Sequence, residues 1–152
     1  MSDQAVQRYA GFELRLVAFL LDLIVLFSFL MLFVAAIVLL LLLSSDGGVE
    51  DPPDSALYAA AVILLVYLFP FSPLYFWAMW VWRGQTVGKM AMAIKIVRRD
   101  RTRVGPGTAA LRLVGYLFST LLFFGGFLMV PFDRERRGLH DRLADTVVLD
   151  LT

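Results

Sequence analysis

Three long apolar runs dominate the pattern of hydrophobic and polar positions along the chain. Residues 23–43, 56–82 and 113–132 contain no charged residue. Each run is about as long as the roughly 20 residues that an α-helix needs to cross about 30 Å of hydrocarbon. With their flanking turns, the runs predict three membrane segments at about residues 16–43, 56–82 and 109–132.

The composition agrees with this pattern and sets the class of protein. Of the 152 residues, 60% are hydrophobic and only 18% are charged, whereas a soluble domain carries about 25% charged residues. We therefore expect an all-α integral membrane protein that forms a single domain over residues 1–152.

Two stretches do not read as straight membrane helices. Gly125, Gly126 and Pro131 interrupt the third segment, which we expect to be broken or re-entrant. Between the second and third segments, apolar residues at helical spacing from Val87 to Val97 favour an amphipathic helix on the cytoplasmic surface, with Lys89 and Lys95 toward the headgroups. Alternating residues near Ile94 would equally suit a short hairpin.

The charges between the segments predict the orientation. Residues 44–55 carry four acidic and no basic residues, while residues 83–103 carry seven basic residues and Asp100 alone. Because Lys and Arg favour the cytoplasmic side, we expect a bacterial plasma membrane protein with a cytoplasmic N-terminus. The C-terminus falls outside if the third segment crosses once, and inside if that segment returns. The basic residues after it, Arg134 among them, favour the inside.

The second segment ends in prolines and aromatic residues. Pro70 and Pro73 each lack a backbone donor, so the carbonyl groups of Val66 and Phe69 lose their helical partners. Such carbonyls either coordinate cations, as in some transporters, or mark a kink that serves packing. The aromatic residues before Arg83 predict a belt at the membrane interface: Tyr75, Trp77, Trp80 and Trp82.

Asp22 is the most informative charge, because it lies inside the first apolar stretch. Arg15 precedes it by seven residues, so the two side chains share one helical face with the small residues Gly11 and Ala18. A face of small residues favours close packing inside the protein. We expect Asp22 either to pair there with Arg112 or Arg142, or to lie at the inner interface in contact with water.

Four motifs together resemble one known family. They are GFELRLVAFLLDLIVL, GQTVGKMAMAIKIV, Arg112 at the start of the third segment, and RRGLHDRLADTVVL. In this order they are similar to the RDD family of bacterial membrane proteins, which is named for an arginine and two aspartates. The resemblance assigns these to Arg15, Asp22 and Asp141. It implies transport of ions or small ligands, with sodium/proton exchange in some members, or partnership with other membrane proteins. Asp145 departs from the family pattern, which usually has glycine there.

The remaining chemistry is sparse. The chain has one histidine, His140, and no cysteine, so we expect neither a metal site nor a cofactor. No nucleophile stands beside a plausible base, and we expect no enzyme. The basic residues 83–103 suit anionic lipid headgroups, and beside membrane segments they do not indicate a nucleic acid partner. His140 beside Asp141 suits a proton relay or a backbone hydrogen bond.

These observations predict a protein that transports or senses cations or protons through a charge cluster: Arg15, Asp22, Arg112, His140 and Asp141. The alternative is a non-transporting assembly or scaffolding subunit for other membrane proteins. Three segments enclose little pathway, so transport requires a homo-oligomer.

Overall fold

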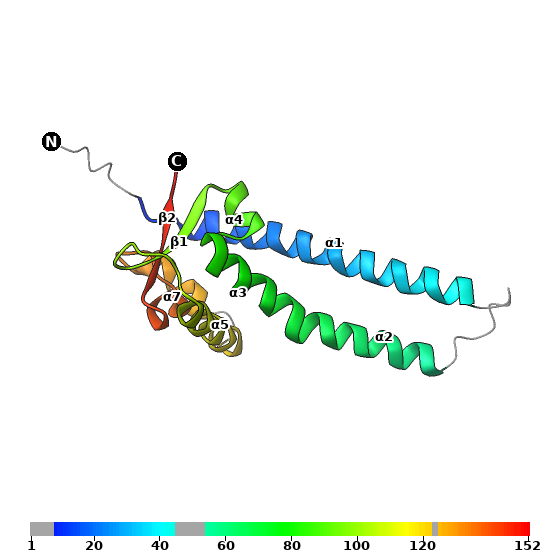
Figure 1. Cartoon of the computed structure of the whole chain (residues 1–152). Coiled ribbons are helices and arrows are strands. Elements are labelled where there is room, and N and C mark those ends of the chain that lie inside the picture. Colours follow the sequence, from blue (N-terminus) through cyan, green and yellow to red (C-terminus); the bar gives the residue numbers. More distant parts are fainter. Residues whose placement is uncertain (1–7, 45–53, 123–124) are drawn as a thin grey trace. The chain divides into compact units, whose positions relative to one another are not determined.

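The computed structural model describes residues 8–44, 54–122 and 125–152 (Figure 1). Its order of elements is α1 (Phe12–Ser44), α2 (Asp54–Val66), a π-helical turn (Tyr67–Phe71), α3 (Ser72–Arg83), α4 (Val87–Ala91), β1 (Ile94–Arg98), α5 (Pro106–Leu121), α6 (Gly125–Leu128), a 3₁₀ turn (Val130–Phe132), α7 (Leu139–Leu143) and β2 (Thr146–Asp150). The chain is therefore mostly helical.

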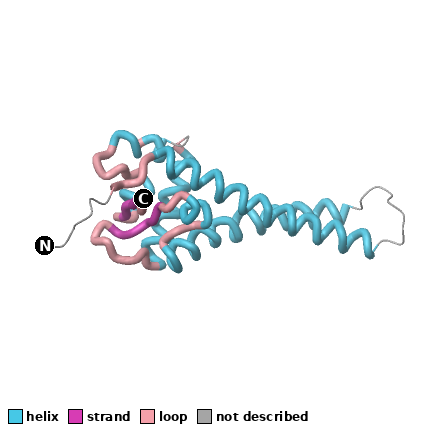
Figure 2. The backbone as a smooth tube through the Cα atoms, turned by 90° about the horizontal axis from the view of Figure 1, so that it is seen from above, coloured by secondary structure: helices cyan, strands magenta, loops and turns pink. Residues whose placement is uncertain are grey.

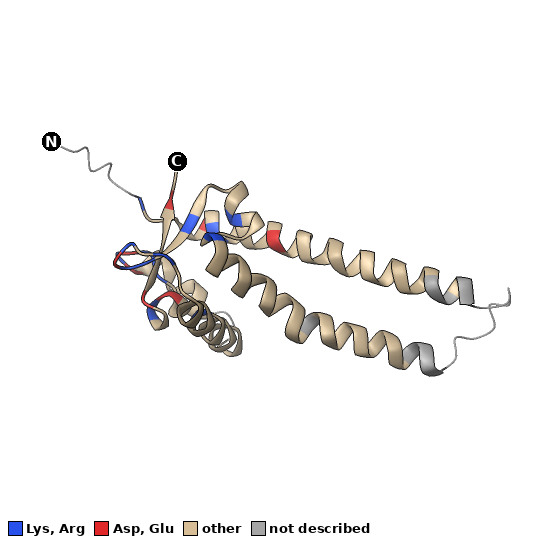
Figure 3. Cartoon of the chain, in the orientation of Figure 1, with Lys and Arg blue, Asp and Glu red and all other residues tan. Residues whose placement is uncertain are grey.

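The chain divides into two compact units. The first unit combines Met1–Asp22 with Tyr75–Thr152, and the second unit is Leu23–Leu74. Lysine, arginine, aspartate and glutamate gather on the elements of the first unit (Figure 3). The boundary between the units falls inside α1, after Asp22, so one helix belongs to both units. The single domain expected over residues 1–152 stays a prediction.

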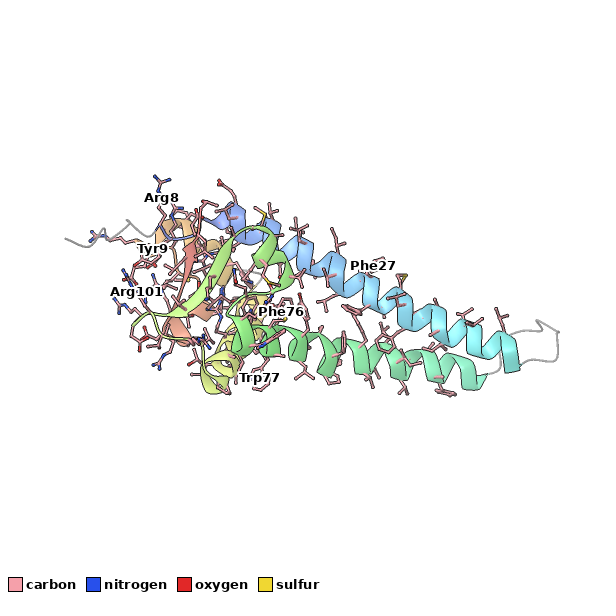
Figure 4. The ribbon with its side chains drawn as sticks, turned by 45° about the horizontal axis from the view of Figure 1, so that its top comes forward. Arg8, Tyr9, Phe27, Phe76, Trp77 and Arg101 are labelled. Carbon is pink, nitrogen blue, oxygen red and sulfur yellow. The ribbon has the colours of Figure 1, made fainter. Side chains whose placement is uncertain are left out.

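Two helical stretches are long and apolar enough to cross a membrane, Phe12–Leu39 and Tyr58–Arg83. The stretches Pro106–Leu121 and Gly125–Phe132 are bent by 106° at the break between them, and they form a third span if the pair is counted as one. The described residues therefore contain two such spans, or up to three. The bend lies where the two glycines predicted a break. Large apolar side chains, including Phe27 on α1, are exposed along the helices (Figure 4), which suits contact with lipid.

The second unit is held together by aromatic packing. The Phe71 ring meets the rings of Phe29 and Phe33 edge to face, with centroids 6.1 Å apart in each pair, and it stacks on Tyr67 at 5.3 Å. Tyr67 donates its phenolic hydrogen to the carbonyl oxygen of Leu26. Because aromatic pairs prefer these geometries, they fix how α1 and the π-helical turn pack.

The prolines of the second segment are accommodated without ending the helix. Pro70 lies inside the π-helical turn, and the Ser72 amide donates to the carbonyl of Tyr67, five residues earlier. A π-helical turn shifts the hydrogen-bond pattern by one residue and so absorbs the donor that proline lacks. The predicted break at Val66 and Phe69 is therefore a local change of helix type.

The first unit contains a small sheet that the all-α expectation missed. β1 and β2 pair antiparallel, with Ile94 opposite Asp150 and Arg98 opposite Thr146 (Figure 2). On the other edge of β2, Tyr9 forms a bridge with Leu149, and the Ala10 amide donates to the Val148 carbonyl at 2.9 Å. The hairpin alternative was also wrong, because β1 pairs with a distant strand and not with its neighbour in sequence.

The core of the first unit lies between this sheet and the helices. Its buried residues are Ala10, Ala18, Trp80, Ile94, Ile96, Val104, Ala109 and Val148. Trp80 is only 1% exposed, so it belongs to the core and not to the predicted aromatic belt. Trp82 is 73% exposed, with the guanidinium carbon of Arg83 5.1 Å from its ring, as a belt residue would be.

Candidate functional site

Asp22 lies on the buried face of α1 and has no exposed surface. Its carboxylate accepts hydrogen bonds from the Thr86 hydroxyl at 2.5 Å, the Gly88 amide at 2.7 Å and the Tyr75 hydroxyl at 3.0 Å. The predicted pairing with Arg112 or Arg142 was therefore wrong, as was the alternative of contact with water. Three neutral donors satisfy the carboxylate, which makes an arginine partner unnecessary.

The short helix α4 packs closely against α1 at Asp22, to which Thr86 and Gly88 donate hydrogen bonds. Thr86 is its N-cap residue, and the threonine oxygen also accepts the Lys89 amide. A Cβ added at Gly88 would lie 1.9 Å from the Ala18 carbonyl oxygen, so only glycine lets α4 approach α1 this closely. The small residue Ala18 thus serves the buried face that its spacing predicted.

Asp141 on α7 binds two arginines. It accepts from Arg15 Nη1 at 2.5 Å and from Arg112 Nη1 at 2.6 Å, and also from the Gly138 amide at 3.1 Å. Burial opposes its ionisation, but the neighbouring positive groups outweigh burial and hold the pKa of Asp141 below its ordinary range. The structure thus brings together Arg15, Arg112 and Asp141, which the sequence places up to 126 residues apart.

Arg112 is the central cation of this arrangement and is fully buried. It also donates to the Thr146 hydroxyl, and its guanidinium carbon lies 5.1 Å from the Trp80 ring centroid. Arg112 Nε and Nη2, like Arg15 Nη2, make no hydrogen bond within the described part of the chain. The other predicted partner of Asp22, Arg142, binds Asp133 instead at 2.7 Å.

Lys89 is the residue that the sequence analysis misplaced. Its side chain was expected at the headgroups, but the residue is only 5% exposed, and its Nζ lies 6.0 Å from the Trp80 ring centroid. Burial lowers the pKa of Lys89 to about 8, against the opposing pull of Asp22. The helical spacing from Val87 to Val97 predicted the wrong side for Lys89, because the helix α4 has only five residues. The signal that could have identified Lys89 is its neighbour Gly88, which marks a close approach.

His140 is 3% exposed and packs between aromatic rings, 4.4 Å from Tyr116 and 4.9 Å from Phe127 by ring centroids. Burial, followed by repulsion from Arg112, Arg15 and Lys89, lowers the pKa of His140 to about 3 although Asp141 opposes this. His140 is therefore neutral at physiological pH. Its Nε2 lies 3.5 Å from Asp141 Oδ1.

A cavity of about 310 Å³ lies within the first unit beside these charges. Its polar lining comes from Arg15, Lys89, Arg112, Tyr116, Thr120 and His140, and the rest of its lining is apolar. Neither Asp22 nor Asp141 lines it. Within residues 8–44, 54–122 and 125–152, no group of three histidine, aspartate or glutamate side chains is placed to hold a metal ion.

Three further residues from the sequence analysis, Val66, Phe69 and Asp145, do not line this cavity. Val66 and Phe69 belong to the second unit. Asp145, where glycine was the usual residue of the resembled pattern, follows α7 with a positive φ of 47°. Glycine adopts that conformation at little cost, and the turn forms here with aspartate.

Comparison with known proteins supports the resemblance. The family profile described as the RDD family matches residues 9–145. An uncharacterised protein of Bacillus subtilis (strain 168), YxaI, is 36% identical over 64 residues, which are 42% of this chain and 42% of that protein. An uncharacterised protein of Rickettsia prowazekii (strain Madrid E), RP437, is 32% identical over 75 residues, which are 49% of this chain and 42% of that protein. The matches thus cover less than half the length of either relative. No solved structure matches the chain.

Proposed function

This chain belongs to the RDD family, and we propose that it senses or moves protons through the buried charge cluster, defined as Arg15, Asp22, Lys89, Arg112 and Asp141. One observation carries the proposal: the buried Lys89 and Arg112, together with Arg15, whose side chain is only 11% exposed, share the cluster with only two carboxylates. The surplus positive charge is costly in a site shielded from water. Release of one proton balances the cluster.

Lys89 is the group that releases this proton. Arginine stays protonated at every physiological pH, whereas a buried lysine titrates readily. Its pKa of about 8 reflects burial first, with Asp22 and Asp141 favouring the charged form and Arg112 and Arg15 opposing it. Tyr116 and the neutral His140 line the same cavity as Lys89, and Tyr75 donates a hydrogen bond to Asp22.

The geometry favours protons over metal cations as the charge involved. The Asp22 oxygens already accept three hydrogen bonds, and Asp141 is engaged by two guanidinium groups. A metal cation prefers free carboxylate or carbonyl oxygens, and the cavity is instead lined by Arg15, Lys89 and Arg112. A proton needs no such site.

The experiment uses Trp80 as a built-in probe, because Lys89 Nζ lies 6.0 Å from its ring. Trp77 and Trp82 are replaced by Phe, so that Trp80 is the only tryptophan. Its fluorescence is then followed in nonionic detergent between about pH 6 and pH 10. We expect a transition near pH 8 that disappears in Lys89→Met and persists in the matched control Lys95→Met.

A flat titration in the parent protein, or an equal one in Lys89→Met, would contradict the proposal. Sensing and transport are separated by a second measurement in liposomes that contain a pH-sensitive dye under an imposed proton gradient. Flux that is lost in Lys89→Met indicates transport, and a Trp80 transition without flux indicates sensing.

The second candidate is a non-transporting assembly or scaffolding subunit. It is favoured by the two or up to three spans, which enclose little pathway in one copy. Proton transport would therefore proceed in a homo-oligomer. Absence of both flux and the Trp80 transition would favour the assembly function. Neither candidate gives the chain a catalytic step.

We also propose that the basic segment 83–103 contacts anionic headgroups at the cytoplasmic face of a bacterial plasma membrane. A cleft of about 630 Å³ in the first unit is lined by Arg83, Lys95, Arg101 and Arg103. No acidic residue lines this cleft. Each basic residue near an anionic membrane surface contributes roughly 1 kcal/mol of attraction.

A further inference from the structure

The cavity of the first unit has two kinds of wall. Arg15, Lys89 and Arg112 form a cationic wall, whereas Leu16, Leu20 and Leu128 form part of an apolar wall. The three leucines are 43%, 50% and 56% exposed, so the apolar wall reaches the surface of the unit. A ligand that fits both walls must combine charge with apolar surface.

The cationic wall holds donors that the protein leaves unused. Arg112 is fully buried, yet its Nε and Nη2 make no hydrogen bond within the described residues, and the same is true of Arg15 Nη2. A buried N–H group without an acceptor costs free energy, and guanidinium groups match the oxygens of carboxylate and phosphate. The missing partner is therefore an acceptor with negative charge.

The charge of the cluster leads to the same ligand class by a separate route. Arg15, Lys89 and Arg112 face two carboxylates, which leaves one positive charge when Lys89 is protonated. Both carboxylates lie outside the cavity lining, so an anion that enters contacts the basic side chains and not the carboxylates. One negative charge balances the cluster.

We propose that this cavity binds an amphiphilic monoanion, with a carboxylate or phosphate head at Arg15, Lys89 and Arg112 and an apolar chain along Leu16, Leu20 and Leu128. The volume of about 310 Å³ is at the lower end of ligand pockets. It holds the head and the first part of a chain, and the remaining chain extends over the exposed leucines into lipid. This inference goes beyond proton sensing, and it uses the protonated form of Lys89, in which the cluster carries one excess positive charge.

The head and chain could belong to a free fatty acid or to an anionic phospholipid, and native mass spectrometry of the purified full chain in nonionic detergent separates these sources. Palmitate is compared with hexadecanol, and phosphatidylglycerol with phosphatidylcholine of the same chains. We expect one retained molecule of the anionic compound and little of its uncharged or zwitterionic counterpart. Retention of palmitate alone assigns a free acid, and retention of phosphatidylglycerol alone assigns a lipid.

Two pairs of variants locate the bound molecule. Lys89→Met removes a charge from the cavity. Its control is Arg134→Met, which removes an exposed charge outside both this cavity and the basic cleft. Leu20→Trp fills the apolar wall, and Leu23→Trp changes a similarly exposed leucine of the same helix outside the lining. Loss of one charge-assisted contact should reduce retention by about tenfold. Leu20→Trp should reduce it at least as much, while both controls retain the ligand.

Equal retention of the charged and uncharged compounds would overturn the inference, as would full retention by Leu20→Trp. Circular dichroism and gel filtration establish whether each variant is folded. If Lys89→Met is not folded, the comparison of Leu20→Trp with Leu23→Trp tests whether the anion binds in this cavity. The outcome is separable from the proposed function, because the Trp80 transition near pH 8 is measured on other variants without added lipid. A transition without anion retention supports proton sensing alone, and anion retention without a transition supports the bound anion alone.

Discussion

Individual residues show how this protein tolerates charge away from water. Asp22 is satisfied by neutral donors from Thr86, Gly88 and Tyr75, whereas Asp141 binds Arg15 and Arg112 directly. His140 solves the same problem by remaining uncharged between Tyr116 and Phe127. The pKa values of Asp141 and His140 are both shifted, so each of these two residues makes stability depend on pH, in different ranges.

His140 should make the protein sensitive to mild acid. Its folded pKa of about 3 lies below the ordinary value of 6.5, so between these values the unfolded chain holds a proton that the folded chain lacks. The contribution of His140 to stability is therefore complete above about pH 6.5, and it falls by about 1.4 kcal/mol for each pH unit below that value.

The measurement is thermal unfolding in nonionic detergent between about pH 5 and pH 7, where His140 is the only histidine. His140→Phe, which retains an aromatic ring between Tyr116 and Phe127, should lose this slope. A slope of the same size in the variant would show that another group is responsible.

At the scale of elements, the sheet ties the two ends of the first unit together. β2 lies between β1 and the segment around Tyr9, and the Val148 carbonyl bonds the Ala10 amide. The Ile96 amide likewise bonds away from β2, to the Gly84 carbonyl at 2.8 Å. Ile96 and Val148 are therefore a non-hydrogen-bonded pair, the closer kind in an antiparallel ladder.

This register predicts a specific cross-link. The chain has no native cysteine, so Ile96→Cys combined with Val148→Cys should form a disulfide on mild oxidation. The control is Ile96→Cys with Val147→Cys, because Val147 faces the opposite side of the sheet. A mobility shift on non-reducing gels measures the bond, and cross-linking of the control alone would indicate a register shifted by one residue.

The π-helical turn gives a second prediction at this scale. If the carbonyls of Val66 and Phe69 bind no ligand, then Pro70→Ala combined with Pro73→Ala restores a regular helix without affecting the charge cluster. We expect a folded protein whose Trp80 transition near pH 8 is unchanged, because Lys89 and Trp80 both belong to the first unit. Loss of the transition would instead assign a function to the two carbonyls.

At the scale of the whole molecule, the Arg15 and Asp141 ion pair constrains topology. It places α7 beside the beginning of α1, so the C-terminal tail and the N-terminal end of α1 belong on the same side of a membrane. The bend of 106° after α5 lets the chain return to that side. Because Lys and Arg favour the cytoplasmic side, we expect this side to be the cytoplasmic one.

Thr152→Cys tests the arrangement in intact cells with a membrane-impermeant maleimide. We expect labelling only after permeabilisation, whereas Ser45→Cys, in the segment predicted outside, should be labelled at once. Labelling of Thr152→Cys in intact cells would place the tail outside and contradict the arrangement.

The sequence by itself determined the membrane segments. The expected segments 16–43 and 56–82 correspond to the two stretches that could cross a membrane, Phe12–Leu39 and Tyr58–Arg83. The third, 109–132, corresponds to the bent pair of helices, which is a further span only if the pair is counted as one. This was predictable because the cost of placing a helix in lipid is a sum over neighbouring residues, which the sequence displays directly. Gly125 and Gly126, which predicted the interruption of the third segment, can likewise be recognised from the neighbouring residues alone.

Only the tertiary structure decided which groups meet. Asp22 takes donors that lie 64 and 66 residues away, β1 finds its partner in the C-terminal strand, and Lys89 is turned inward. Arg15, Arg112 and several neutral donors were all chemically suitable for either carboxylate, and nothing local distinguishes among them. The close approach of Gly88 to Ala18 places α4 against α1 and so gives Asp22 its donors. Such a contact depends on how two helices pack, which neither local sequence shows.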